Sequence, residues 1–205
     1  PNFEPTVAEN VNVSLKDSQV GIKGYYSGGT LASEAAMLVK EAFKEEVPEE
    51  KKDAYILKTN HHEIIDLGDD IYTQGKPHPM IDPEKRIEML ETSGNDPETA
   101  VIMIDNVIGY GSHDDMANEL APAIKRILAN AHQGGRELAV LVTVVGTARD
   151  PQGYEKQIET LKESGAMICE TNDQMVRTAI KLAGGKVEQP VLDIQKFEHT
   201  QEDLT

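Results

Sequence analysis

The stretch Gly24-Tyr25-Tyr26-Ser27-Gly28-Gly29-Thr30-Leu31 joins a short apolar run to a long helical pattern. Apolar residues recur after it at the spacing of one helix face, at Leu31, Ala35, Leu38, Val39 and Ala42. The glycines therefore lie where a strand ends and a helix begins. Such strand-turn-helix units are the building blocks of α/β folds.

The turn Ser27-Gly28-Gly29-Thr30 suits an anion. The first backbone N–H groups of a helix have no partner within it, and the helix dipole makes that end positive, so phosphate or carboxylate can bind there without a basic side chain. Gly28 and Gly29 allow a ligand close to the backbone, and Ser27 or Thr30 can cap the helix or donate a hydroxyl. The same residues also fit an ordinary capped turn, so the turn alone leaves both interpretations open.

Composition favours a cytoplasmic protein that binds small molecules or other proteins. The 205 residues include 36 acidic and 20 basic side chains, and the formal charge of -16 opposes binding to nucleic acid and to anionic membranes. Aromatic residues make up only 4%, so the core is expected to be mainly aliphatic. The single cysteine, Cys169, cannot form an intrachain disulfide, and the sequence shows no leader-like or membrane-spanning run.

Three segments are expected along the chain. Residues 1–20 form an N-terminal arm or linker, residues 21–186 form one domain, and residues 187–205 form a C-terminal tail with an excess of acidic side chains. Within the domain, strands are predicted at 22–26, 54–57, 100–104, 138–145 and 166–169. Helices are predicted at 31–46, at 152–164 and at 172–183. One more helix is predicted to begin near residue 82, and another to end near residue 133. Residues 61–81 are expected to be an irregular loop.

Strands that alternate with helices in this way predict a doubly wound, parallel, five-stranded sheet of the flavodoxin type. Ligands bind such sheets beyond the carboxyl ends of the strands. The turns at Gly28, Gly109 and Gly146 each follow a predicted strand, so they are expected to line one crevice.

Several charged side chains are expected near this crevice. His78 lies between two prolines that stiffen its loop, and His113 follows the Gly109 turn. Arg149 follows the fourth strand, where a guanidinium can clamp a carboxylate or phosphate. Asp105 ends the third strand. A surface loop for His78 and a helix cap for His113 remain the alternative interpretations.

Two groups of residues raise the question of metal binding. The acidic group Asp66, Asp69 and Asp70 can hold Mg²⁺ through water or position a general base, and a solvated acidic loop is the alternative. His61-His62 follows the second strand, but adjacent side chains rarely point at one ion. No metal site is therefore predicted.

Five segments resemble the final domain of FdrA-type proteins, which are described as acyl-CoA synthetases related to succinyl-CoA synthetase and ATP-citrate lyase. These segments are SGGTLASEA (27–35), IDLGDD (65–70), KPHPMIDPEKRIEML (76–90), AVIMIDNVIGYGSHDD (100–115) and VVGTARDPQGYEKQIETLKESGA (144–166). The resemblance implies a flavodoxin-like CoA-ligase domain, in which helix starts of two related domains face each other across a phosphohistidine. It implies coenzyme A and a phosphorylated intermediate, supplied with partner domains, as cofactors; Mg²⁺ is a candidate only through the acidic group Asp66, Asp69 and Asp70.

The resemblance also suggests which residues form the site. By this resemblance, Gly28, Gly29 and Thr30 would lie at such a helix start. The turn Gly109-Tyr110-Gly111-Ser112 resembles the second glycine turn of the same domain, which in the family lies near the acyl carboxylate. The predicted anion-binding residues are Ser27, Gly28, Gly29, Thr30, Gly109, Gly111 and Ser112. The predicted acid–base or electrostatic groups are His78, His113 and Arg149.

Departures from the family limit what the chain is expected to do alone. The synthetase α subunit carries its phosphorylated histidine in a Gly-His-Ala-Gly segment after the fourth strand, whereas Gly146-Thr147 here leads to Asp150-Pro151-Gln152-Gly153. CoA-binding and ATP-grasp domains do not fit within 205 residues either. We therefore expect partner CoA-binding and nucleotide-binding domains or subunits in an oligomer. Two alternatives stay open: a carbamoyltransferase component of oxamate or allantoin breakdown, which the resemblance also suggests, and a non-catalytic assembly domain.

Overall fold

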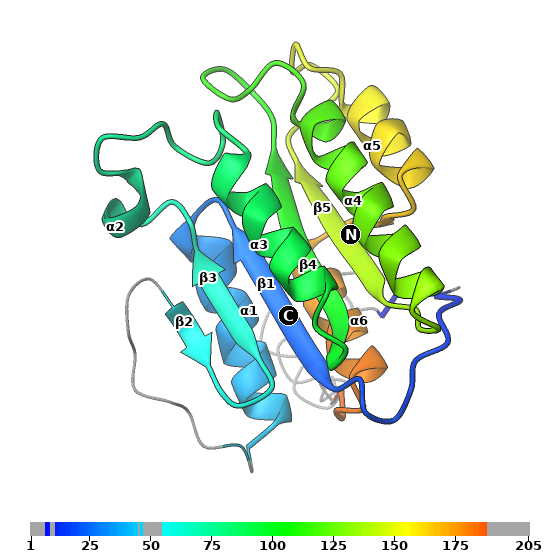
Figure 1. Ribbon diagram of the computed structural model, residues 1–205. Coiled ribbons are helices and arrows are strands. Elements are labelled where there is room, and N and C mark those ends of the chain that lie inside the picture. The colour runs from blue at the N-terminus through cyan, green and yellow to red at the C-terminus, as the bar shows by residue number, and fades with distance from the viewer. Residues whose placement is uncertain (1–6, 9–10, 45, 47–54, 188–205) are drawn as a thin grey trace, which may run out of the picture.

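The computed structural model describes residues 7–8, 11–44, 46 and 55–187. Strands of this part form one sheet in the order β2-β3-β1-β4-β5-β6 (Figure 1). The strands are β1 (Gly21–Tyr26), β2 (Tyr55–Lys58), β3 (Glu63–Asp66), β4 (Thr99–Val107), β5 (Ala139–Val145) and β6 (Met167–Cys169). The helices are α1 (Gly29–Ala42), α2 (Asp70–Thr73), α3 (Glu84–Gly94), α4 (Met116–Gln133), α5 (Tyr154–Glu163) and α6 (Asn172–Leu182).

The sheet is mostly parallel. β1 runs parallel to both of its neighbours, β3 and β4, and the β4–β5 and β5–β6 pairs are parallel as well. This arrangement confirms the predicted α/β fold, which is broadly flavodoxin-like. The segments that follow β1, β3, β4 and β5 leave the sheet at the top of Figure 1. We call these segments, together with the last residues of β4 and β5, the carboxyl edge: residues 27–29, 67–83, 107–115 and 145–153.

The sheet differs from the sequence prediction at its second and third strands. Residues 59–62 connect β2 directly to β3, and Thr59 N–H donates to the His62 carbonyl at 2.8 Å within this turn. β2 therefore pairs antiparallel with β3, and the described sheet has six strands rather than five. β3 was missed because only Ile64 and Ile65 of its four residues are buried and apolar, which is too short a signal to identify a strand.

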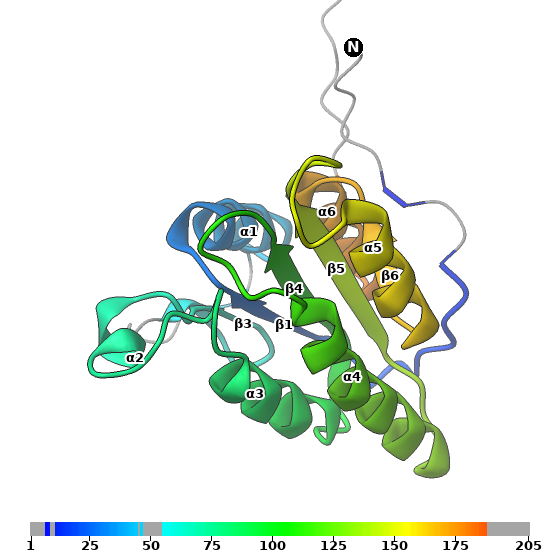
Figure 2. The ribbon, with the colours of Figure 1, turned by 90° about the horizontal axis from the view of Figure 1, so that it is seen from above.

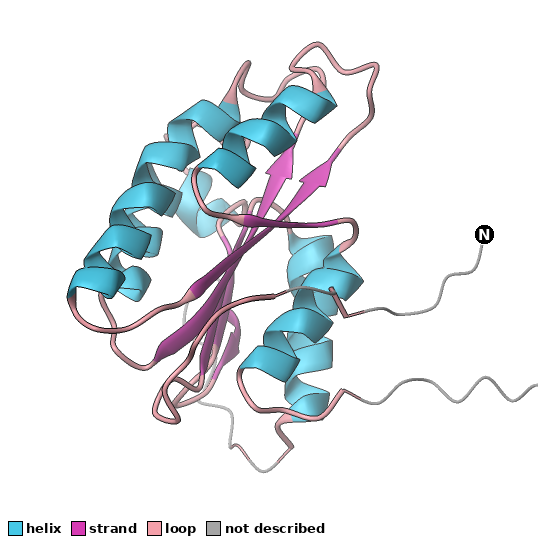
Figure 3. Cartoon of the chain, turned by 90° about the vertical axis from the view of Figure 1, so that its right-hand side faces the viewer, coloured by secondary structure: helices cyan, strands magenta, loops and turns pink. Residues whose placement is uncertain are grey.

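Helices cover both faces of the sheet (Figures 2 and 3). α1 and α6 pack together on one face, while α3 and α4 cover the other, with α5 packed beside α4. The central strand β4 explains this arrangement. Its Val101 and Met103 belong to the core under α1 and α6, whereas Ile102 and Ile104 belong to the core under α3, α4 and α5. A strand that is apolar on both sides needs cover on both sides.

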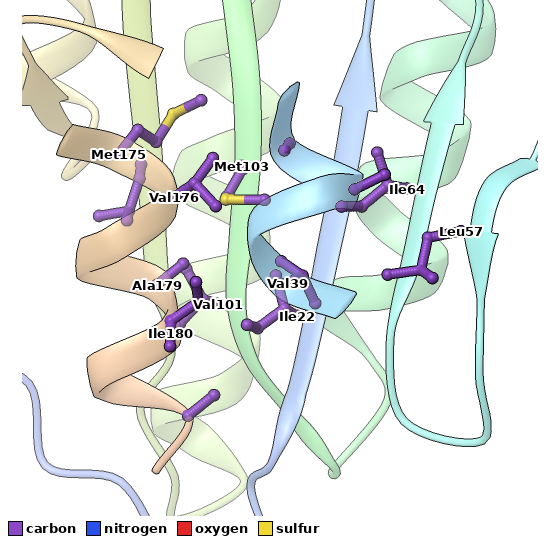
Figure 4. Close-up of a cluster of buried hydrophobic side chains, with 14 of the residues drawn as sticks. Ile22, Val39, Leu57, Ile64, Val101, Met103, Met175, Val176, Ala179 and Ile180 are labelled. Atoms are coloured by element: carbon purple, nitrogen blue, oxygen red, sulfur yellow. The ribbon is translucent and has the colours of Figure 1, made fainter. Parts of the chain in front are cut away.

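The core under α1 and α6 is largely aliphatic (Figure 4). Ile22 of β1, Val39 of α1 and Val176 of α6 are fully buried there, and Met103 of β4 lies among them. Burying an aliphatic side chain of this size contributes about 1.5–3 kcal/mol. This core holds α1 against the centre of the sheet and so fixes where its first turn lies.

Residues 11–20 of the predicted arm lie at the amino ends of the strands. Gln19, which is 3% exposed, donates from Nε2 to the carbonyl oxygens of Thr99, the first residue of β4, and of Glu137, just before β5. Val13 and Leu15 pack on the core under α1 and α6. The arm therefore contacts the sheet at the end opposite the carboxyl edge. Residues 1–6, 9–10 and 188–205, which include nearly all of the predicted tail, lie outside the described residues.

None of the helices in the described part of the chain has the length and apolar character that a membrane span requires.

Candidate functional site

α1 begins at the end of the central strand β1 with an open backbone. Its N-cap residue, Gly28, forms no side-chain hydrogen bond, and its first turn carries no acidic residue. Every other described helix has a side-chain cap or an acidic residue there: Asp69 for α2, Glu84 for α3, Asp115 for α4, Glu155 for α5 and Thr171 for α6. A Cβ atom added to Gly28 would meet nothing within 4 Å. A ligand can therefore reach the first N–H groups of α1.

Ser27 connects this turn to β4 instead of capping α1. Its N–H donates to both carboxylate oxygens of Asp105, at 3.0 and 3.2 Å, and its hydroxyl donates to Oδ2 at 2.9 Å. Asp105 in turn accepts from Arg86 of α3, at 2.6 Å to Oδ1 and 2.7 Å to the carbonyl oxygen. Arg86 and Asp105 are each 1% exposed. The Ser27–Asp105–Arg86 network therefore fixes the β1–α1 turn from behind, while Thr30 is exposed.

Arg86 was not among the predicted site residues. It occupies the buried face of α3 together with Leu90 and Ser93, at helical spacing. A charged residue within an otherwise buried helical stripe is the signal that would have identified it, because a fully buried arginine requires a partner.

Asp66, at the end of β3, lies beside the start of α1. Its Oδ1 accepts the Gly68 N–H at 2.9 Å, and a Cβ atom added to Gly29 would lie 3.0 Å from its Oδ2. The pKa of Asp66 lies above its ordinary value, mainly because the carboxyl group is partly buried. The charges of Asp69 and Asp105 add to this rise, whereas the Gly68 N–H and His78 oppose it. The sequence placed Asp66 only in an acidic cluster.

His78 approaches the same place from the loop after α2. Its Nδ1 accepts the Met80 N–H at 3.1 Å, so the neutral ring carries its proton on Nε2. A Cβ atom added to Gly68 would lie 2.7 Å from His78 Nε2 and 3.2 Å from Asp66 Oδ1. The fold thus brings His78 and Asp66 together near the start of α1.

The turn after β4 presents Tyr110 to solvent. Gly109 and Gly111 have φ angles of 133° and 84°, which other residues rarely adopt, and Tyr110 between them is 94% exposed. Gln152 accepts the Gly109 N–H at 3.0 Å and donates to the Gly109 carbonyl at 2.8 Å. This buried glutamine, which the sequence did not single out, fixes the turn against the segment before α5.

The start of α4 already holds a carboxylate. Asp115 caps the helix and accepts hydrogen bonds from Asn118 and from Gln157 Nε2. Burial raises the pKa of Asp115, but these hydrogen bonds outweigh that effect, so its pKa lies below the ordinary value. The predicted residues Gly109, Gly111 and Ser112 therefore precede a helix start that already carries a negative charge.

His113 and Arg149 lie farther along the carboxyl edge. The His113 N–H donates to the Met80 carbonyl at 2.8 Å, which joins the turn after β4 to the loop that carries His78. Arg149 is exposed in the turn after β5, which the Thr147 N–H closes by donating to Asp150 Oδ2 at 2.6 Å. The three glycine turns thus share one edge, and of the three predicted acid–base or electrostatic groups His78 is the one beside α1.

The described residues include no group of three or more His, Cys, Asp or Glu side chains arranged to hold a metal ion. His62 is buried, and its Nδ1 accepts the Ile22 N–H at 3.0 Å, so it supports the start of β1. Cys169 is also buried, and burial raises its pKa to about 12, which disfavours the reactive thiolate.

Known proteins are similar to this chain in sequence. A family model described as CoA-ligase matches residues 25–182. The Escherichia coli K12 protein named "Uncharacterized protein YahF" is 37% identical over 174 residues, which cover 82% of this chain and 34% of YahF. The crystal structure of PH0766 from Pyrococcus horikoshii OT3 matches 80% of this chain and 35% of that one, with a TM-score of 0.49 and 16% identity. The chain spans about a third of the length of both proteins.

Proposed function

Since the chain belongs to the CoA-ligase family, we propose that it is the ligase-type domain of an FdrA-type acyl-CoA synthetase related to succinyl-CoA synthetase. In this proposal the start of α1 holds an acyl or phosphoryl anion. The observation that carries it is the open backbone at Gly28, with neither a side-chain cap nor an acidic residue in the first turn. A helix start of this kind binds anions through its free N–H groups and its dipole.

The buried ion pair behind the turn supports this role. Arg86 and Asp105 neutralise each other, and Asp105 holds both the N–H and the hydroxyl of Ser27. Because this network fixes the turn, the free N–H groups at the start of α1 are already in place. They need no reorganisation when charge develops on a transferring acyl or phosphoryl group. The α1 start would therefore stabilise such a group as well as bind it.

Coenzyme A, when bound, would supply the thiol that accepts the acyl group. The open backbone at Gly28 fits the small anionic end of that reaction. Among the charged residues of the carboxyl edge, acidic ones such as Asp69, Asp82, Asp114 and Asp150 outnumber Lys76 and Arg149, which opposes binding of the coenzyme's phosphates by this chain. We therefore assign the binding of coenzyme A and of nucleotide to partner domains or subunits.

Exposed apolar side chains at the carboxyl edge support docking of such a partner. Four of the five large apolar side chains that are exposed in the described part of the chain lie there: Ile71 (51%), Ile81 (49%), Tyr110 (94%) and Val145 (38%). Exposed apolar side chains along one edge of the molecule offer contact area to a docking protein. A partner that covered them would also exclude water from the start of α1.

A carbamoyltransferase component is the second candidate, and Asp66 favours it. A carbamoyl group carries N–H donors beside its oxygen, and Asp66 Oδ2 lies next to Gly29, where it can accept one of them. Carbamoyl phosphate should then bind this chain more tightly than acetyl phosphate, as measured by calorimetry. Equal affinities would remove the reason to prefer carbamoyl transfer.

A proline substitution tests the proposed anion site. Gly29 is the first residue of α1, where proline is compatible with a helix, and Gly28 has the extended conformation (φ -160°, ψ 156°) that suits the residue before proline. Gly29→Pro removes one N–H donor, so calorimetry should show inorganic phosphate bound about tenfold more weakly or worse. Gly29→Ala is the matched control, because it adds a Cβ atom but keeps the N–H. Unchanged phosphate affinity in Gly29→Pro would overturn the assignment of the site.

A further inference from the structure

A carboxylate lies within the proposed anion site. Asp66 Oδ1 is occupied by the Gly68 N–H, which leaves Oδ2 as the oxygen beside Gly29. An ionised carboxylate can only accept hydrogen bonds. A ligand at the start of α1 therefore meets N–H donors on one side and an acceptor on the other.

Gly68 allows Ser27, Asp66 and His78 to lie close together. A Cβ atom there would lie 2.5 Å from the Ser27 carbonyl oxygen, 2.7 Å from His78 Nε2 and 3.2 Å from Asp66 Oδ1. The missing side chain lets the ends of β1 and β3 and the loop carrying His78 approach one another.

His78 adds a fixed donor to the site. Its Nδ1 is held by the Met80 N–H, and its carbonyl accepts from the Ile81 and Asp82 N–H groups, at 2.8 and 3.0 Å. The neutral ring therefore presents an Nε2 proton near Gly68. The donors of the site are thus the α1 N–H groups and His78, and its acceptor is Asp66.

We propose that Asp66 determines the specificity of this site by selecting anions that carry a proton or an N–H group beside their charged oxygens. The ligand class is then hydrogen phosphate, a protonated phosphoryl group or a carbamoyl group, so within the proposed function Asp66 favours the phosphoryl anion over an ionised acyl carboxylate, and fully ionised oxyanions are disfavoured. This inference rests on the proposed function, because it requires an anion at the start of α1.

Phosphate and sulfate are a suitable pair of anions for testing this selectivity. They have nearly the same shape and size, but at neutral pH phosphate keeps at least one O–H group, whereas sulfate has none. The phosphate O–H can donate to Asp66 Oδ2, while a sulfate oxygen would face that carboxylate with repulsion and no hydrogen bond. Because a charged hydrogen bond is lost in this way, phosphate should bind at least about tenfold more tightly than sulfate.

The test compares both anions by calorimetry on the 205-residue chain and two variants. Asp66→Asn replaces the acceptor with an amide that can donate, so sulfate should bind more tightly and the preference for phosphate should disappear. Asp69→Asn is the matched control, since it removes the same charge nearby and asparagine also caps helices as Asp69 caps α2. That control should keep the preference.

The outcomes distinguish this inference from the proposed function. If the unmodified chain binds sulfate as tightly as phosphate, and Gly29→Pro weakens both, the selectivity is wrong and the anion site stands. If neither anion binds, the proposed site fails and the selectivity fails with it. Retention of the preference for phosphate in Asp66→Asn would also overturn the role of Asp66.

A pH series on the unmodified chain provides a second measurement if Asp66→Asn fails to fold. Protonation gives Asp66 a donor, so sulfate binding should strengthen as the pH falls, beginning at a higher pH than an ordinary aspartate would allow because its pKa is raised. Asp69, His78 and Asp105 also face Asp66. His78→Gln therefore serves as the comparison: it should keep the pH dependence if Asp66 is its source, and loss of the dependence would contradict the inference.

Discussion

His62 is a buried titratable residue whose protonation should weaken the fold. It is 1% exposed, its Nδ1 accepts the Ile22 N–H, and its ring lies 4.3 Å from that of Phe43. Burial lowers the pKa of His62 to about 4; Glu46, whose Oε1 lies 3.3 Å from Nε2, opposes the shift only in part. Protonation would also place a hydrogen on Nδ1, where the backbone N–H now donates.

The sign of the pH dependence follows from these values. The folded pKa of about 4 lies below the value of 6.5 for a free histidine, so His62 stabilises the fold fully above pH 6.5. This stability is lost as the pH falls from 6.5 towards 4, by at most about 1.4 kcal/mol per pH unit.

Urea unfolding between pH 7 and pH 4.5 checks this expectation. His62→Gln should lower the free energy of unfolding at pH 7 and flatten its decline at lower pH. His61→Gln, which alters the partly exposed neighbour, should keep the decline. An equally steep decline in His62→Gln would assign the acid sensitivity to other groups.

At the scale of the elements, the start of α1 depends on two others, α3 and β4. Removing Arg86 alone would leave Asp105 charged, buried and without its cation, which costs about 3–5 kcal/mol in comparable buried pairs. We therefore expect Arg86→Met to lower the free energy of unfolding by about that amount and to loosen the Ser27 turn.

The double variant Arg86→Met/Asp105→Asn provides the comparison. It removes both charges but keeps a side-chain oxygen that can accept from Ser27, so it should be more stable than Arg86→Met alone. Urea unfolding of the two single variants and the double variant measures the coupling. Losses that simply add would show that the two side chains act independently.

The elements also show how far sequence reasoning reaches. The strand and helix on either side of Gly28 were predicted because their apolar patterns are local and long enough to identify. The roles of Ser27 and Gln152 could not be predicted, since each depends on a partner distant in sequence: Ser27 and Asp105 are 78 residues apart, and Gln152 and Gly109 are 43 apart. Gly68 likewise looked like part of an ordinary loop until the fold placed it against His78 and Ser27.

At the scale of the whole molecule, the carboxyl edge is expected to be the surface that meets the partner. Tyr110→Ser/Ile81→Ser should reduce the fraction of complex formed with the proposed CoA-binding and nucleotide-binding partners, as measured by analytical size exclusion. Both side chains are exposed, so the stability of the chain itself should change little. Met37→Ser is the matched control, because Met37 is 65% exposed but lies on α1, away from this edge. Equal complex formation by the double variant and the control would place the interface elsewhere.

The lengths of the outer strands have a consequence for aggregation. β2 and β6 border the described sheet with four and three residues, whereas the central β4 has nine. Short border strands expose few unpaired backbone groups to another chain, which limits the joining of sheets edge to edge. High concentrations of this protein should therefore yield little fibrillar or strand-swapped material, even though its central strands are rich in the aliphatic residues that favour such assemblies.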